Sequence, residues 1–119
     1  MAENTPGIFS NPLVLKHVFD KVPSLFFHLD IGHANIAPKN LTPTILKYLS
    51  KKLVHVHVSD NSGKADEHLA IGRGTVNWQK MLAELKLTGY DGTITLEVFT
   101  SQKERFNSKA KIRAIWNDL

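Results

Sequence analysis

Three polar residues stand at matching places near the ends of three apolar segments of the sequence. Asp30 closes LFFHLD, His57 is the last but one residue of LVHVHV, and Glu97 is the last but one residue of TITLEV. One imidazole and two carboxylates suit Mn²⁺, Mg²⁺, Zn²⁺ or Fe²⁺ better than copper. The chain has no cysteine, which excludes thiolate zinc sites, disulfides and iron–sulfur clusters. The sequence therefore predicts a divalent metal site. It contains no nucleotide-binding glycine loop, so no organic cofactor is expected.

The three segments have the length and the β-branched composition of strands, and we predict strands at 25–30, 53–58 and 93–98. Helical patterns lie before, between and after them. Four helices are expected, and their start signals are Asn11, Thr42, Asn77 and Ser101. Strands that alternate with helices of this length predict an α/β fold with a parallel sheet and right-handed crossovers.

The two faces of each predicted strand differ, because side chains alternate across a strand. One face is apolar and suited to packing against helices, whereas the other becomes polar toward the C-terminal end of the strand. Polar residues at the C-terminal ends of strands are typical of a barrel with its site at that mouth. His28 and His55 lie one step below the mouth on the polar face. We predict that they are hydrogen-bonded interior groups or partners of the metal ligands rather than ligands.

Four stretches of the chain together resemble one superfamily. They are ENTPG (3–7), HLDIGHANI (28–36), HVHVSDNSGKADEHLAIGRGTVNW (55–78) and GYDGTITLEVF (89–99). They are similar to the C-terminal half of the xylose isomerase-like TIM barrels, which include sugar phosphate isomerases and epimerases and the endonuclease IV type of AP endonuclease. The resemblance implies a partial (β/α)8 TIM barrel of three to four parallel strands and four helices. It also implies that residues 1–119 are a single domain, the C-terminal half of the barrel, with the N-terminal half missing.

The resemblance also implies the roles of particular residues. In the epimerase branch one divalent ion is held by Glu, Asp, His and Glu, which correspond here to Glu3, Asp30, His57 and Glu97. The two glutamates of that branch exchange a proton at the carbon next to a metal-polarised carbonyl. The expected function is therefore that of a divalent-metal-dependent sugar or sugar-phosphate isomerase or epimerase, with a small-molecule sugar as its partner.

Two alternatives remain open at this point. His33, Asp66 and His68 are implied to hold a second metal or to contact substrate, and with them the chain matches many ligands of the three-zinc endonuclease branch. That branch normally has an arginine where this chain has Glu67, and an acidic side chain there disfavours a phosphodiester substrate. The second alternative is a non-catalytic truncated barrel, because a complete barrel takes about 250 residues and this chain has 119.

Composition limits the partners of the chain. The net charge is +4, and the basic residues are scattered rather than gathered, so we expect no nucleic-acid partner. No apolar run is long enough to cross a membrane and no signal segment opens the chain, so a cytoplasmic location is expected. A partial barrel leaves open sheet edges, and open edges recruit other strands. We therefore predict self-association.

Overall fold

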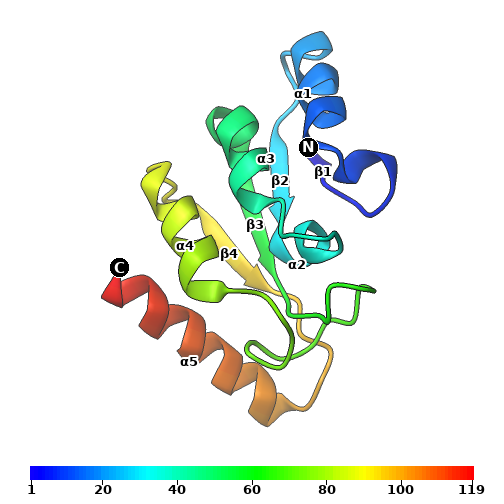
Figure 1. Cartoon of the computed structure of the whole chain (residues 1–119). Coiled ribbons are helices and arrows are strands. Elements are labelled where there is room, and N and C mark those ends of the chain that lie inside the picture. The colour runs from blue at the N-terminus through cyan, green and yellow to red at the C-terminus, as the bar shows by residue number, and fades with distance from the viewer.

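A computed structural model describes all 119 residues of the chain (Figure 1). Helices follow strands along most of its length. The elements in order are β1 (Ala2–Glu3), the 3-10 turn η1 (Ile8–Ser10), α1 (Pro12–Lys21), β2 (Phe27–Asp30), α2 (Ile31–Asn35), α3 (Thr42–Leu49), the 3-10 turn η2 (Ser50–Lys52), β3 (Leu53–Val58), α4 (Trp78–Leu87), β4 (Thr93–Leu96) and α5 (Gln102–Asp118).

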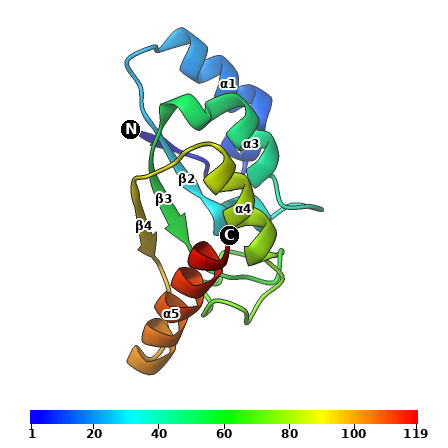
Figure 2. The same ribbon diagram turned by 90° about the vertical axis from the view of Figure 1, so that its left-hand side faces the viewer.

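The strands form one parallel sheet in the order β1-β2-β3-β4. The register sets Glu3 beside His28, Asp30 beside His57 and His57 beside Thr95. Figure 2 shows the strands on one side of the molecule and α1, α3 and α4 on the other. This is the predicted α/β arrangement of a partial TIM barrel, with helices on one face of the sheet only.

The hydrophobic core fills the layer between the sheet and these helices. Phe27, Leu29 and Val56 point into it from the strands and are completely buried. The ring of Phe19 on α1 meets the ring of Phe27 edge-on, with 5.5 Å between their centroids. These apolar positions alternate with the polar positions that face the other side, so the packing of the core fixes the direction of the polar side chains.

Two strands are shorter than the sequence pattern predicts. The predicted strand at 25–30 begins only at Phe27, because the Leu25 N–H is bonded to the Val22 carbonyl in the turn that follows α1. The strand predicted to reach Val98 ends at Leu96, although the N–H of Glu97 still donates to the Val58 carbonyl at 3.0 Å. The ladder bond from Glu97 therefore keeps the carboxylate at the strand end.

The helix starts agree with their predicted caps except at α3. The side chains of Asn11, Asn77 and Ser101 each accept a backbone N–H of the first turn that follows. Thr42 was predicted to cap α3, but it is the first helical residue, and its own N–H donates to the side chain of Asn40. The short helix α2 (Ile31–Asn35) was not predicted, because five residues are too few to show a helical period.

The long segment between β3 and α4 is organised by Asp60, which is completely buried. Its carboxylate accepts hydrogen bonds from four donors: the backbone N–H groups of Asn61, Gly72 and Val76 and the indole N–H of Trp78. Any side chain at Gly74 would collide with Asp60 and with the Asn61 carbonyl. Gly72 adopts a φ of +85°. Both glycines therefore serve the shape of the loop.

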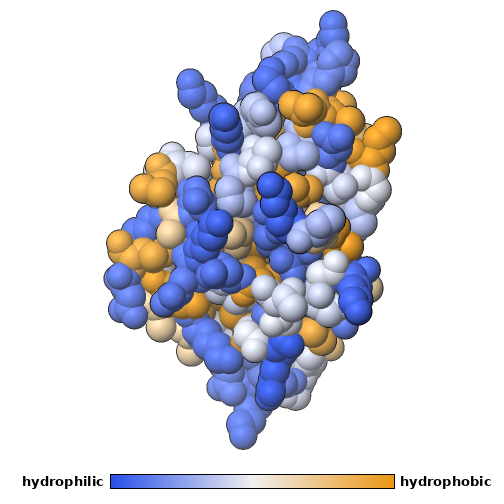
Figure 3. Space-filling view, viewed as in Figure 1, coloured by the Kyte–Doolittle hydropathy of each residue, from blue (hydrophilic) through white to orange (hydrophobic).

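The surface on the side of the helices is mostly hydrophilic (Figure 3). Exposed apolar residues are nonetheless present near the N-terminus, where Ile8 and Leu13 reach the surface. None of the helices combines the length and the apolar character needed to cross a membrane.

The Asp60 network generates a prediction for stability. Replacing Asp60 by Asn presents an NH₂ group to donors that now meet a carboxylate oxygen, so buried N–H groups lose their acceptor. We expect Asp60→Asn to lower the free energy of unfolding by about 3 kcal/mol, measured by urea denaturation. Asp118→Asn, which changes an exposed aspartate, is the matched control and should leave stability unchanged. Equal stability of the two variants would contradict the role given to Asp60.

Candidate metal centre

The C-terminal ends of the four strands bring together the four residues expected to hold a metal. Glu3 ends β1, Asp30 ends β2, His57 lies next to the end of β3, and Glu97 follows β4. The sheet order therefore places the two glutamates on the outer strands, with Asp30 and His57 between them. All four side chains lie on the face of the sheet that α1, α3 and α4 do not cover.

Asp30 is the central and most deeply buried member, with 1% of its surface exposed. Its Oδ1 accepts the N–H of His33 at 2.8 Å and so caps α2. Its Oδ2 is buried and has no hydrogen-bond partner. The Nδ1 atoms of His33 and His57 are 3.8 Å and 3.9 Å from this oxygen.

Two glutamate–histidine pairs flank Asp30. Glu3 Oε1 is 3.1 Å from His33 Nδ1, and Glu97 Oε1 is 3.0 Å from His57 Nδ1. Potential ligand atoms of Glu3, Asp30 and His33 lie within 4.8 Å of one another, as do those of Asp30, His57 and Glu97. Asp30 is common to both groups, which makes it the point where the acidic side chains converge.

His33, Asp66 and His68 form a second ring of polar side chains at the same end of the sheet. Asp66 Oδ2 is 3.1 Å from His33 Nε2 and 3.0 Å from His68 Nε2. The other ring nitrogen of His68 is 2.9 Å from the Glu97 carbonyl oxygen. His68 has a φ of +48°, which is strained for a residue other than glycine, and its ring stacks on Phe99. The structure thus brings all seven predicted site residues to one region.

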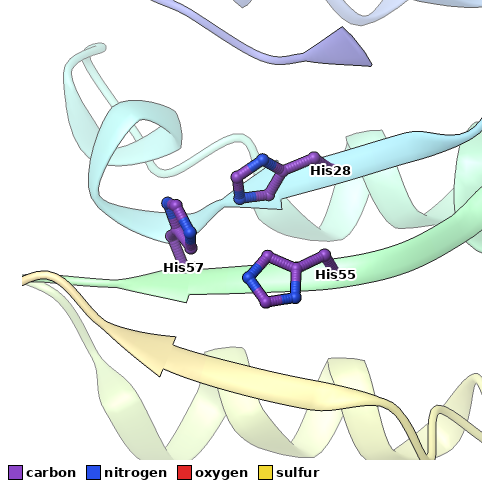
Figure 4. Close-up of side chains that lie close together, drawn as sticks. All are labelled: His28, His55 and His57. Atoms are coloured by element: carbon purple, nitrogen blue, oxygen red, sulfur yellow. The ribbon is translucent and has the colours of Figure 1, made fainter. Parts of the chain in front are cut away.

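Further down the same face, His28 and His55 join His57 in a cluster of three imidazole rings (Figure 4). The ring centroids are 4.0–5.0 Å apart. His55 is half-buried and hydrogen-bonded to the hydroxyls of Thr93 and Thr95. His28 differs, because its Nε2 is buried and unpartnered.

Two carboxylates of this region, those of Glu3 and Asp30, have raised pKa values. Burial raises the pKa of Asp30, and the charge of Glu97 adds to this, while the hydrogen bond from the His33 N–H opposes it. Burial and the neighbouring Asp30 likewise raise the pKa of Glu3. A cluster of desolvated acids of like charge is an electrostatic cost that a bound cation relieves.

The pKa values of the histidines shift in different directions because their neighbours differ. Burial lowers the pKa of His28 to about 4, and the adjacent His57 and His55 contribute to this shift. Burial also lowers the pKa of His57, although Glu97 opposes it. For His33, burial is outweighed by the carboxylates of Asp30, Asp66 and Glu3, which raise its pKa. His57 is therefore neutral at neutral pH, the form in which an imidazole can bind a metal.

The donor set fits a divalent cation. Two atoms aimed at the centre, Asp30 Oδ2 and His57 Nδ1, are buried without a hydrogen-bond partner. An unsatisfied buried acceptor is unfavourable in a folded protein unless another ligand completes it. Glu3 and Glu97 supply further oxygens beside these atoms. Three carboxylates and one imidazole match the preference of Mn²⁺, Mg²⁺, Fe²⁺ or Zn²⁺.

Two residues that position the site were not predicted from the sequence. Asn4 is buried, and its side chain bonds to both the N–H and the carbonyl of Asp30, each at 2.8 Å, which ties β1 to the end of β2. Asp60 shapes the loop that carries Asp66 and His68. Both residues lie close in sequence to predicted site residues. Asn4 directly follows Glu3, and Asp60 comes three residues after His57. These short spacings are the sequence signal from which their roles could have been predicted.

Comparison with known proteins agrees with this architecture. Residues 1–116 match the family described as xylose isomerase-like TIM barrel. A solved D-tagatose 3-epimerase-like protein superposes with a TM-score of 0.83 and 32% identity, covering 98% of this chain and 47% of that one. Fructoselysine 3-epimerase of Escherichia coli O157:H7 is 32% identical over 89 residues, which are 71% of this chain and 31% of that protein.

An uncharacterized protein of Methanocaldococcus jannaschii is 46% identical over 70 residues, which are 57% of this chain and 24% of that protein. The chain therefore spans about half of the solved relative and about a third or less of these curated relatives. The match to the family extends over nearly the whole chain, and the parallel strands with polar residues at their C-terminal ends agree with it. The chain belongs to the xylose isomerase-like TIM barrel family.

Proposed function

We propose that this chain carries the metal and acid–base residues of a divalent-metal-dependent sugar or sugar-phosphate isomerase or epimerase. The observation that carries the proposal is the convergence of Glu3, Asp30, His57 and Glu97 at one end of the sheet, with Asp30 Oδ2 unpartnered at the centre. The named relatives that act on sugars, a D-tagatose 3-epimerase-like protein and fructoselysine 3-epimerase, support the substrate class.

In the proposed reaction Glu3 and Glu97 work on opposite sides of one substrate carbon. One carboxylate removes the proton from the carbon next to the carbonyl, and the carboxylic acid of the other returns a proton to the opposite face, which inverts that carbon. The raised pKa of Glu3 suits it to hold a proton closer to neutral pH than an ordinary glutamate does. Their places on the outer strands leave the space over β2 and β3 between them.

Glu3, Asp30, His57 and Glu97 would hold the divalent ion. The chemistry that the ion supplies when bound is polarisation of the substrate carbonyl and stabilisation of the negative charge that develops on its oxygen. Asp30 contributes a fixed oxygen because Asn4 clamps its backbone and its Oδ1 is engaged in capping α2. His33, Asp66 and His68 stand where they can contact substrate oxygens.

An endonuclease IV-like zinc phosphodiesterase is the second candidate. The observation that favours it is Asp66 Oδ2, which lies about equally close to His33 Nε2 and His68 Nε2, as a carboxylate between two further metal ligands would. Glu67 opposes it, because this exposed carboxylate occupies the loop where a phosphodiester would need positive charge. This candidate requires three zinc ions, whereas the epimerase type requires one ion.

We also propose that residues 1–119 form the C-terminal half of a TIM-barrel domain and that the chain self-associates. Within the sheet, β1 pairs only with β2, and β4 pairs only with β3, so both outer strands have a free edge. Free strand edges pair readily with other strands. Phe26, which precedes β2, is 56% exposed and adds apolar surface next to β1.

The first prediction from the proposed function concerns the pH dependence of cation binding. Because Glu3 and Asp30 bind protons more tightly in the folded than in the unfolded chain, the metal-free protein loses stability as pH rises from their ordinary pKa to the raised pKa. Protons compete with the cation over this range. At a fixed concentration equal to 100 times its Kd at pH 8, Mn²⁺ is expected to stabilise the fold by about 2.7 kcal/mol at pH 8. The same concentration should stabilise the fold much less at pH 5, measured by thermal unfolding.

Asp30→Asn is the control for this prediction. The Asn4 bonds reach only the backbone of residue 30, and an amide oxygen can still accept the His33 N–H, so the variant should fold. It lacks the charged oxygen at the centre, and Mn²⁺ should no longer raise its unfolding temperature. A shift as large as that of the unchanged protein would contradict the site.

The second prediction concerns proton exchange. With a ketose substrate in D₂O, the chain is expected to introduce deuterium at the carbon next to the carbonyl, detected by NMR. Glu3→Gln and Glu97→Gln each remove one proton carrier, and each should slow the exchange by at least about 100-fold. Lys80→Gln, a change on the exposed surface of α4, should leave it unchanged. Exchange that survives Glu97→Gln would refute the mechanism.

The third prediction concerns oligomeric state. Sedimentation equilibrium at micromolar concentration should give a mass above that of the 13.4 kDa monomer. Phe26→Asp should shift the equilibrium toward monomer, because it replaces exposed apolar surface next to β1 by a charge. Leu87→Asp, at the exposed end of α4, should not shift it. A chain that stays monomeric throughout would refute self-association.

A further inference from the structure

The three-histidine cluster has a geometry that the proposed reaction does not use. His55 and His57 are two residues apart on β3 and therefore share a face, and His28 is the direct partner of His55 on β2. This register brings three imidazoles from two strands to one place (Figure 4). One potential ligand atom from each lies within 4.8 Å of the other two.

Each ring also has an oxygen beside its Nδ1. Glu3 Oε2 is 3.6 Å from Nδ1 of His28, Thr93 Oγ1 is 2.8 Å from Nδ1 of His55, and Glu97 Oε1 is 3.0 Å from Nδ1 of His57. In metal sites, the ring nitrogen that does not bind the ion usually donates to an oxygen, which fixes the tautomer and the orientation of the ring. Of these three contacts only that of His55 is a hydrogen bond, whereas Nδ1 of His57 is unpartnered and faces the carboxylate centre. In each ring Nε2 is the nitrogen that does not face one of these oxygens, which makes it the atom available to an ion.

His28 gives an independent indication of a missing ligand. Its side chain is 91% buried, with a relative exposure of 9%. Its Nε2 is shielded from solvent and has no hydrogen-bond partner. In Figure 4 this side of the ring faces His57 and His55, while Nδ1 faces β1. A buried polar atom without a partner in a native protein calls for an unseen ion or water.

We propose that His28, His55 and His57 form a second metal site, which takes a borderline transition-metal ion such as Zn²⁺, Co²⁺ or Ni²⁺ through their Nε2 atoms. Three imidazoles with one open position are a known donor set for zinc. A site of nitrogen ligands alone discriminates against Mg²⁺ and Mn²⁺, which prefer oxygen. The site shares His57 with the carboxylate centre but lies one step further from the strand ends. The hydroxyl of Thr95, now 3.1 Å from His55 Nε2, turns away when the ion binds.

The test separates this site from the carboxylate centre by removing the latter. Co²⁺ binding is measured by titration calorimetry and by the visible absorption of the ion in Asp30→Asn, which lacks the central carboxylate. We expect one Co²⁺ per chain in this background. Adding His55→Gln or His28→Gln should weaken Co²⁺ binding at least 10-fold. Adding His17→Gln, which changes an exposed histidine on α1, should not.

Two outcomes would overturn the proposal. One is that the Asp30→Asn variant binds no Co²⁺ although its circular dichroism spectrum is that of the unchanged chain. Co²⁺ binding would then require the carboxylates. The other is equal Co²⁺ affinity in the His55→Gln, His28→Gln and His17→Gln backgrounds. Neither outcome bears on proton exchange by Glu3 and Glu97, so failure of this site is distinguishable from failure of the proposed reaction.

A measurement on the unchanged chain tests the proposed three-histidine site even if a variant does not fold. Nitrogen-15 NMR of the imidazole rings, recorded as Zn²⁺ is added to the unchanged chain, reports which ring nitrogen binds the ion. The proposal expects Nε2 of both His28 and His55 to acquire the chemical shift of a metal-bound nitrogen. A change confined to His57, or to His57 together with His33, would contradict it.

Discussion

The carboxylate of Asp30 is buried at the end of β2, and only one of its two oxygens is satisfied by the protein. Transfer of an ionised carboxylate from water to a protein interior costs several kcal/mol unless a counter-charge or hydrogen bonds replace the lost water. Asn4 holds the backbone of Asp30 from β1, and the start of α2 uses Oδ1. The remaining oxygen, Oδ2, faces the candidate metal centre. The side chains of His33 and His57 lie next to it.

The rest of the fold provides this arrangement in two ways. The packing of Phe27, Leu29 and Val56 under the helices turns the alternate residues of β2 and β3 toward the uncovered face. The buried Asp60 holds the loop after β3 in the shape that brings Asp66 and His68 beside the strand ends. Core packing and a buried hydrogen-bond network thus both position the side chains of the site.

The sequence predicts those parts of the site that depend on local pattern. Asp30, His57 and Glu97 follow from strand alternation and from their places at strand ends. Glu3 required the family resemblance, because β1 is only two residues long and has no period. The roles of Asn4 and Asp60 depend on partners 26 and up to 18 residues away, and the cluster at His28 depends on cross-strand register. Such contacts exist only in the folded chain. The short spacing from predicted site residues could have singled out Asn4 and Asp60, but it does not specify their partners.

The central claim is that one divalent cation binds at Asp30 between the two glutamates. Native mass spectrometry of the full chain with Mn²⁺ as the sole divalent ion tests it most directly, because it counts ions and identifies them. The proposed epimerase-type site predicts one Mn²⁺ per chain and none in Asp30→Asn. Absence of bound Mn²⁺ in the unchanged chain, or one ion retained in Asp30→Asn, would contradict the account.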